Sequence, residues 1–149
     1  MFQVLASTPS QTEKIAARII KKAVQKPRDG ALCVGLFGEL GAGKTTFIRG
    51  VAKSLGVRRA VQSPTFIIMR PLPLPKQLRG ISTIYHFDWY RINRAKDIEA
   101  LGWREVLQDS VNLVLVEWAD KFPHLFKENI IQVHMLIYKK GRKIVVRNN

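Results

Sequence analysis

The most informative stretch of the sequence is GELGAGKT, which runs from Gly38 to Thr45. Two glycines separated by four residues, followed by a lysine and a hydroxyl residue, make the pattern of loops that cradle phosphate groups. At average residue frequencies, a chance match anywhere in a chain of this length has a probability under about 1%. The stretch therefore predicts a site for a nucleoside triphosphate, ATP with Mg²⁺.

Both flanks of this loop predict the elements that such a site requires. Ala31 to Phe37 (ALCVGLF) is a continuous apolar run, typical of a strand buried on both faces. After Lys44, apolar residues recur at helical spacing, and Gly56 is placed to end the helix. These apolar positions are Phe47, Ile48, Val51, Ala52 and Leu55. Strand, glycine loop and helix thus follow in order, which disfavours the alternative of a glycine turn that only caps a helix.

The chemistry of the predicted loop depends on its backbone and on two side chains. Backbone N–H groups at the start of a helix converge on an anion, and the helix dipole adds to the attraction. Lys44 is placed to reach the β- and γ-phosphates, and the Thr45 hydroxyl is placed to ligate Mg²⁺. We expect the nucleotide to contact the loop and the residue after it, namely Gly38, Glu39, Leu40, Gly41, Ala42, Gly43, Lys44, Thr45 and Thr46.

Two acidic residues end apolar runs elsewhere in the chain. Glu117 closes VNLVLVEW (residues 111–118), a second buried strand, and is the best candidate for the acid that a metal-bound triphosphate needs. Asp120 competes with it for this role. Asp88 ends another apolar run, where its carboxylate could order either magnesium-bound water or the attacking water. Lys44, Asp88 and Glu117 are the candidate catalytic residues.

The remaining segments predict an α/β fold. Ser10 and Glu13 resemble a capping box that opens a first helix ending before Pro27. Residues 66–70 and 81–92 predict two strands around a long Pro-rich loop at residues 71–80. The other expected elements are a short helix at residues 97–101, ending at Gly102, and a C-terminal hairpin formed by residues 128–138 and 143–147.

Composition bounds the function more loosely. The chain of 149 residues, 46% hydrophobic, has room for one domain over residues 1–149. Its net charge of +14 favours anionic partners, but the basic residues are spread along the sequence, which predicts general attraction rather than a base-reading surface. Cys33 is the only cysteine, which excludes an intramolecular disulfide and a Cys-based metal site. With no signal peptide and no apolar stretch near ~20 residues, we expect a cytoplasmic protein without membrane contact.

The chain resembles the bacterial TsaE (YjeE) family in four short motifs that occur in the same order: GELGAGKT, SPTF (residues 63–66), HFDWYR (86–91) and VEWAD (116–120). Proteins of that family are small ATPases of the tRNA threonylcarbamoyladenosine system. The resemblance covers most of the chain. It implies a P-loop NTPase fold, with a mostly parallel central sheet extended by antiparallel strands and helices on both faces. The strongly basic balance and the insertion at residues 71–80 depart from the family's pattern.

The resemblance also implies roles for individual residues and partners. Thr45 and Glu117 would hold Mg²⁺, Asp88 would be needed for hydrolysis, Thr65 would lie on a switch-like loop, and Trp118 would lie close to the nucleotide. The implied partners are TsaB-like and TsaD-like proteins of the threonylcarbamoyl transferase complex. Contact with tRNA, direct or through the complex, is a further expectation. The ATPase would be slow without these partners.

Two other function classes stay open at this point. The same loop serves small-molecule kinases, in which Arg58, Arg59 and Arg70 could clamp a transition state. A nucleotide-binding RNA adaptor without useful turnover is the other alternative, since the chain is strongly basic. Transfer of phosphate to an acceptor would identify a kinase, whereas tight tRNA binding that ignores ATP would identify an adaptor.

Overall fold

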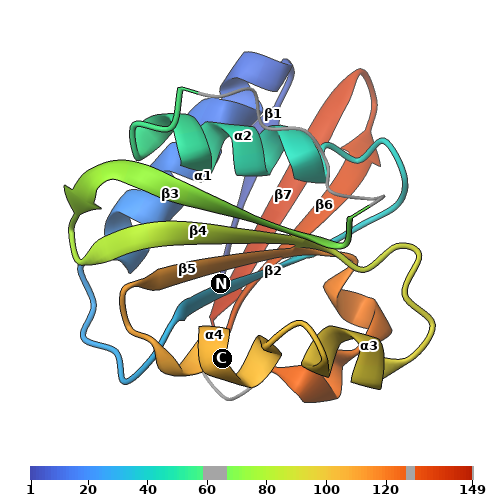
Figure 1. The fold of residues 1–149 in the computed structure, drawn as a ribbon. Coiled ribbons are helices and arrows are strands. Elements are labelled where there is room, and N and C mark those ends of the chain that lie inside the picture. Colours follow the sequence, from blue (N-terminus) through green and yellow to red (C-terminus); the bar gives the residue numbers. More distant parts are fainter. Residues whose placement is uncertain (59–66, 127–129, 149) are drawn as a thin grey trace.

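Seven strands form one mixed sheet in the order β1-β7-β6-β2-β5-β4-β3, with helices on both of its faces (Figure 1). This computed structural model describes residues 1–58, 67–126 and 130–148. The strands are β1 (Phe2–Ala6), β2 (Leu32–Phe37), β3 (Met69–Leu78), β4 (Ile81–Asp88), β5 (Asn112–Glu117), β6 (Ile131–Tyr138) and β7 (Gly141–Asn148). The helices are α1 (Pro9–Ala23), α2 (Lys44–Ser54), α3 (Ala95–Glu99) and α4 (Trp103–Gln108), with two 3-10 turns, η1 (Ala119–Lys121) and η2 (Pro123–Leu125).

The centre of the sheet is parallel and its edges are antiparallel. Strands β6, β2, β5 and β4 run parallel to one another, while β7 pairs antiparallel with β6 and β1, and β3 pairs antiparallel with β4. Because the carboxyl ends of parallel strands meet at one edge, β2, β4 and β5 deliver their last residues to the same place. The prediction of an α/β fold with a mixed sheet and helices on both faces is confirmed.

Each face of the sheet has its own hydrophobic core. Helices α1 and α2 cover one face and bury Phe47, Ile48 and Leu115. Helices α3 and α4 cover the other face, where Trp89 and Trp103 meet edge to face with ring centroids 5.3 Å apart. Successive side chains of a strand point to opposite faces of the sheet, so consecutive residues of β4 and β5 lie in different cores.

Two predicted helix boundaries were wrong. Helix α1 is capped by Thr8 rather than Ser10: the Thr8 hydroxyl accepts from the Gln11 N–H at 3.2 Å, and the Gln11 side chain accepts from the Ser7 N–H at 2.6 Å. A Thr-x-x-Gln box two residues upstream therefore starts the helix, with Pro9 in its first turn. Gly102, predicted to end a helix, is instead the N-cap of α4. Helix α4 itself was not predicted from the sequence.

The Pro-rich segment is a strand rather than a loop. Strand β3 runs through it at the edge of the sheet, with Pro71 opposite Tyr85 and Pro73 opposite Thr83. Alternate residues of a strand turn their nitrogens to the same side, and at an edge strand one side has no ladder partner. Prolines spaced two apart can therefore occupy this edge without removing a ladder hydrogen bond. The prediction of a loop assumed that prolines exclude a strand, which is not true at the edge of a sheet.

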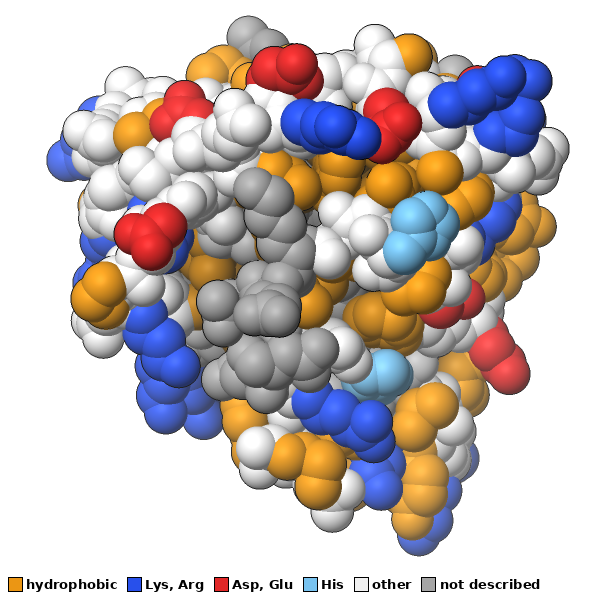
Figure 2. Space-filling model, turned by 90° about the horizontal axis from the view of Figure 1, so that it is seen from below, with side chains coloured by type: hydrophobic (Ala, Val, Ile, Leu, Met, Phe, Trp, Pro, Cys, Tyr) orange, Lys and Arg blue, Asp and Glu red, His pale blue; other side chains and the backbone are white. Residues whose placement is uncertain are grey.

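The net charge of +14 is not gathered in one patch on the face of the molecule seen in Figure 2. On the face seen in Figure 2, lysine and arginine side chains lie at several separate places, with acidic side chains between them. Across α1 and α2, Glu13 pairs with Lys53 at 2.8 Å and with Arg49 at 3.9 Å. Among the described residues, no helix has the length and apolar character needed to cross a membrane.

Gly50 allows the close approach of α1 and α2, and its replacement is expected to destabilise the protein. A Cβ at Gly50 would lie 2.4 Å from the Cα of Glu13 and 2.5 Å from its carbonyl oxygen. Since these are backbone atoms, Gly50→Ala should lower the free energy of unfolding by about 2 to 3 kcal/mol in urea denaturation. Gly41→Ala is the control, because Gly41 has open space around it and a φ of 77°. It should cost about 1 kcal/mol, and an equal or larger loss at Gly41 would contradict the clash.

Candidate nucleotide site

The glycine loop connects β2 to α2, as the sequence predicts. Gly43 caps α2 with a φ of 101°, and the helix start has neither a side-chain cap nor an acidic residue in its first turn. Gly38 fits closely against β6, since a Cβ there would lie 2.2 Å from the Met135 carbonyl oxygen. The first N–H groups of a helix lack intrahelical partners, so this end of α2 is suited to bind an anion.

Lys44 is buried against the loop that it belongs to. Its ammonium donates to the carbonyl oxygens of Gly38 at 2.6 Å and Glu39 at 2.9 Å, and lies 3.8 Å from the centroid of the Trp118 ring. Burial lowers the pKa of Lys44 below its usual 10.5, and the attraction of nearby carboxylates, Glu117 first, opposes this shift. Two carbonyl oxygens and the Trp118 ring thus hold the Lys44 ammonium beside the glycine loop.

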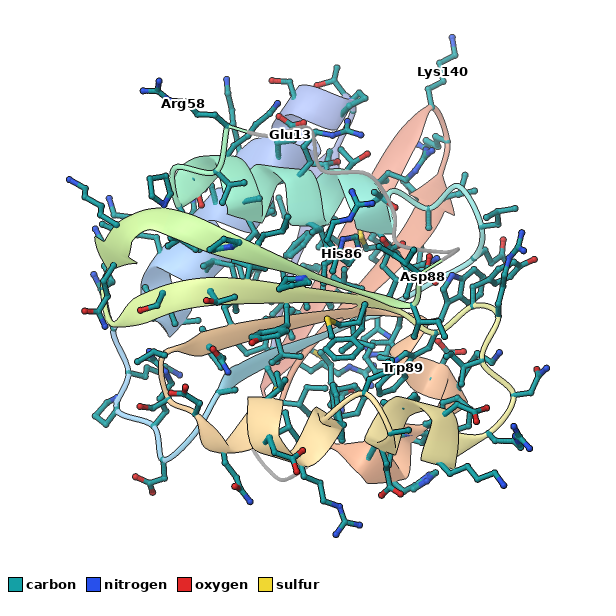
Figure 3. All side chains as sticks on the ribbon, in the orientation of Figure 1. Glu13, Arg58, His86, Asp88, Trp89 and Lys140 are labelled. Atoms are coloured by element: carbon teal, nitrogen blue, oxygen red, sulfur yellow. The ribbon has the colours of Figure 1, made fainter. Side chains whose placement is uncertain are left out.

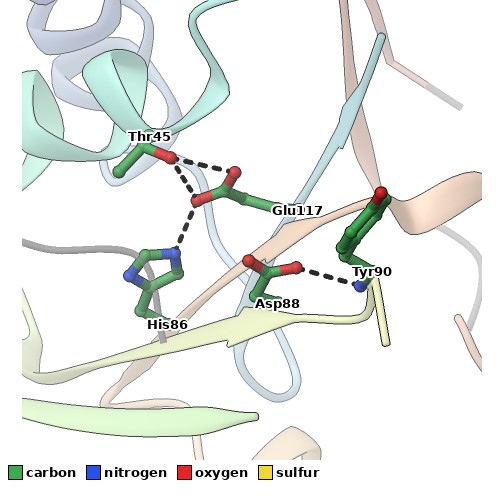
Figure 4. A network of polar contacts seen from close by, with 5 residues as sticks. All are labelled: Thr45, His86, Asp88, Tyr90 and Glu117. Atoms are coloured by element: carbon green, nitrogen blue, oxygen red, sulfur yellow. Dashed lines mark hydrogen bonds and ion pairs between the residues drawn. The ribbon is translucent and has the colours of Figure 1, made fainter. Parts of the chain in front are cut away.

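Glu117 meets the loop from the neighbouring strand. In the parallel pairing of β2 with β5, Glu117 is the partner of Leu36, at the edge where the loop begins. The Thr45 hydroxyl donates to its carboxylate, 2.9 Å from Oε1 and 3.1 Å from Oε2 (Figure 4). Only 4% of Glu117 is exposed, whereas Asp120 lies exposed on η1. Of the two competing acids, Glu117 is the one in contact with Thr45.

Asp88 and His86 lie beside Glu117 on the next strand. Asp88 is the register partner of Glu117, and its Oδ1 accepts a hydrogen bond from the Tyr90 N–H at 2.9 Å. His86, two residues earlier in β4, places Nε2 2.9 Å from Glu117 Oε1. Figure 3 shows His86 and Asp88 on the α2 side of the sheet and Trp89 on the other side. The structure thus brings together the acids predicted from two separate strand ends.

Trp118 lies at the margin of the site. It follows β5 in the left-handed region, with a φ of 61°, and its ring is 5.0 Å from that of Tyr90. The contact with Lys44 places it beside the glycine loop. Leu40, at the tip of the loop, is 74% exposed. Thr65, the remaining predicted contact, lies outside the described residues.

Two site residues escaped the sequence analysis. His86 shares the strand face of Asp88, two positions away, and this spacing could have identified it. Arg142 in β7 donates from Nη2 to the Gly41 carbonyl oxygen at 2.8 Å, across 101 residues of sequence. Nothing in the sequence signals that contact, because it depends on the register of the C-terminal hairpin.

The oxygen atoms at Thr45 and Glu117 fit a magnesium ion. Mg²⁺ prefers hard oxygen ligands and is commonly bound through one or two protein groups together with substrate phosphates. Within the described parts of the chain, no group of three or more His, Cys, Asp or Glu side chains could hold a metal alone. Thr45 and Glu117 supply two oxygen groups of the kind that Mg²⁺ prefers.

Trp118 should report ligand binding at the loop. Trp89 and Trp103 are buried on the other face of the sheet, whereas Trp118 is half-buried against Lys44. A phosphate that attracts the Lys44 ammonium would change the surroundings of the Trp118 ring but not those of Trp89 and Trp103. Titration with Mg-ADP should therefore alter tryptophan emission. Trp118→Phe should abolish this change, and Trp103→Phe should retain it. A signal that survives in the Trp118 variant would contradict the placement.

Comparison with known proteins gives a consistent result. Residues 6–144 match a family model described as threonylcarbamoyl adenosine biosynthesis protein TsaE. A curated protein of Rickettsia prowazekii, tRNA threonylcarbamoyladenosine biosynthesis protein TsaE, is 36% identical over 120 residues, which cover 80% of this chain and 76% of that protein. The protein of the same name from Bacillus subtilis is 38% identical over 132 residues, covering 89% and 73%.

A solved structure is similar along nearly the whole chain. The crystal structure of Bacillus subtilis YdiB superposes with a TM-score of 0.70 at 25% sequence identity. The match covers 96% of this chain and 82% of that one.

Proposed function

Because this chain belongs to the TsaE family of threonylcarbamoyladenosine biosynthesis proteins, we propose that it is a P-loop ATPase that binds Mg-ATP at residues 38–46. The observation that carries the proposal is the contact of the Thr45 hydroxyl with both carboxylate oxygens of Glu117. These two residues come from the loop and from the neighbouring strand, as in sites where a P-loop hydroxyl and a second acid share one magnesium ion.

The residues around this contact support distinct roles. Lys44 and the start of α2 would bind and orient the phosphates, and Thr45 and Glu117 would hold the metal. Magnesium, when bound, supplies positive charge that stabilises the transferring phosphoryl group. Asp88, 4% exposed and adjacent to Glu117 in register, is placed to accept a proton from the attacking water or to orient that water. The proposed reaction converts ATP and water to ADP and inorganic phosphate.

The proposed biological role is accessory to tRNA modification. The TsaE family acts in threonylcarbamoyladenosine biosynthesis, and we propose that this chain uses ATP hydrolysis to change its contacts with TsaB-like and TsaD-like proteins. The β4–α3 connection is well placed for such a change, because it starts at Asp88 and is tied to η1 by Lys121, which donates to the carbonyl oxygens of Tyr90 and Ile92. A shift at the phosphate site would reach this exposed connection directly.

The kinase alternative has less support from the arginines that motivated it. Arg58 lies beyond the C-terminal end of α2, and the 11 residues of that helix span about 16 Å. Figure 3 shows it at the far end of the helix from His86 and Asp88. Arg59 lies outside the described residues, and only Arg70, the register partner of His86, remains near the site.

Product analysis tests the proposed function. The protein is incubated with Mg-ATP, alone and with candidate TsaB-like and TsaD-like proteins, and both free phosphate and phosphate on added acceptors are measured. We expect slow release of free phosphate that increases when the partners are present. Phosphate on an acceptor would support a kinase instead. No turnover under any condition, together with tRNA binding that ATP does not change, would support an adaptor.

A further inference from the structure

The Glu117 carboxylate receives hydrogen bonds from two different elements of the fold. Thr45, in α2, donates at 2.9 and 3.1 Å, and His86, in β4, lies 2.9 Å from Oε1 (Figure 4). In the proposed function the Thr45 oxygen also serves the metal, so its geometry changes when ligand binds. His86 is the contact that is independent of the metal.

The chemistry of the pair defines which group donates. A carboxylate only accepts, so the hydrogen lies on Nε2 of His86. His86 is 0% exposed and Glu117 is 4% exposed, so water competes little for this bond. The other ring nitrogen of His86, Nδ1, has no hydrogen-bond partner among the described residues. The polar contact that the structure gives this ring is therefore directed to Glu117.

The Lys44 ammonium attracts the same Glu117 carboxylate that Thr45 contacts. The Lys44 ammonium is bonded to the carbonyl oxygens of Gly38 and Glu39, and Glu117 is the carboxylate that attracts it most strongly. A glutamate side chain has several rotatable bonds, so the strand register alone does not determine where its oxygens lie. A Glu117–Lys44 ion pair would remove the metal ligand and engage the phosphate-binding charge at the same time.

We propose that His86 is a positioning residue that holds the Glu117 carboxylate against Thr45 and keeps it from pairing with Lys44. The proposal rests on the proposed function, since it assigns His86 to the magnesium side of that site. Residues that orient a metal ligand affect metal affinity by about 10- to 100-fold when they are replaced. Replacement of His86 should therefore reduce the gain in nucleotide affinity that Mg²⁺ provides, and should change the affinity without Mg²⁺ much less.

The test compares two variants with a control. His86→Leu removes the donor, His86→Gln keeps an N–H near the position of Nε2, and His124→Leu removes an exposed imidazole on η2. Binding of ADP is measured by calorimetry with Mg²⁺ and with EDTA. In His86→Leu we expect the gain from Mg²⁺ to fall by about 10- to 100-fold, while affinity in EDTA stays within about threefold. His86→Gln should recover much of the gain, and His124→Leu should match the wild type.

Several outcomes would overturn the proposal. An unchanged magnesium gain in folded His86→Leu, an equal loss with and without Mg²⁺, or no recovery in His86→Gln would each contradict it. If His86→Leu does not fold, NMR of the His86 ring in the wild-type protein decides, because hydrogen on Nδ1 alone would contradict the donation to Glu117. A wild-type protein without any magnesium gain would instead overturn the proposed function, and this proposal with it.

Discussion

Replacement of Lys44 by methionine is expected to reduce ATP hydrolysis by about two to three orders of magnitude. Methionine keeps an unbranched side chain in the buried site but removes the positive charge that we propose acts on the phosphates. Turnover is measured at saturating ATP, so that weakened binding does not account for the loss. Retained turnover in a folded Lys44→Met variant would contradict the site assignment.

The matched control is Lys53→Met in the same helix. The Lys53 side chain is 59% exposed and pairs with Glu13 at 2.8 Å, away from the glycine loop. Loss of an exposed ion pair costs about 0 to 1 kcal/mol of stability. Hydrolysis by Lys53→Met should therefore equal that of the wild type, and a similar loss in both variants would indicate a general effect of removing positive charge from α2.

Lys44→Met also has a pH-dependent effect on stability. Burial lowers the pKa of Lys44 in the folded protein below 10.5, so the charged form is disfavoured by folding. This destabilisation is fully present below the folded pKa and disappears as the pH rises to 10.5. The stability of Lys44→Met relative to wild type should therefore fall between neutral pH and pH 10.5 in urea denaturation. A difference that stays constant or grows would contradict the lowered pKa.

Replacement of Glu117 by glutamine is expected to have the second large effect, a loss of about 10²- to 10³-fold in magnesium-dependent hydrolysis. The amide oxygen can still accept from Thr45 and His86, so the local packing is preserved, but the negative charge that Mg²⁺ needs is gone. The gain in nucleotide affinity that Mg²⁺ provides should also be lost. Calorimetry with Mg²⁺ and with EDTA measures this gain directly.

Two further substitutions sharpen the assignment of the acid. Glu99→Gln removes an exposed carboxylate that pairs with Arg104 at 3.0 Å on the other face of the sheet, and turnover should not change. Asp120→Asn tests the competing acid, which lies exposed on η1. A loss of the magnesium gain in Asp120→Asn, with the gain retained in Glu117→Gln, would exchange their roles.

The errors of the sequence analysis have physical causes. The prolines at residues 71–75 break most secondary structure, but an edge strand tolerates them, and the position of β3 at the edge is set by sheet order rather than by local sequence. Helix α4 has only 6 residues, which are too few for a periodic pattern to stand out. It depends on the burial of Trp103 in the core on the α3 and α4 face of the sheet. The cap of α1 was misplaced because two capping boxes overlap in the same stretch.

The glycine loop from Gly38 to Thr45, its flanking strand and helix, and the acids at two strand ends can all be predicted from the amino-acid sequence. These features are local: backbone dihedral angles, helix termini and apolar periodicity act over a few residues. The contact of Thr45 with Glu117 rather than Asp120, and the position of His86 beside them, follow from the packing of the folded chain. That contact depends on the parallel register of β2, β5 and β4, in which Leu36 and Glu117 pair although they lie 81 positions apart in the chain.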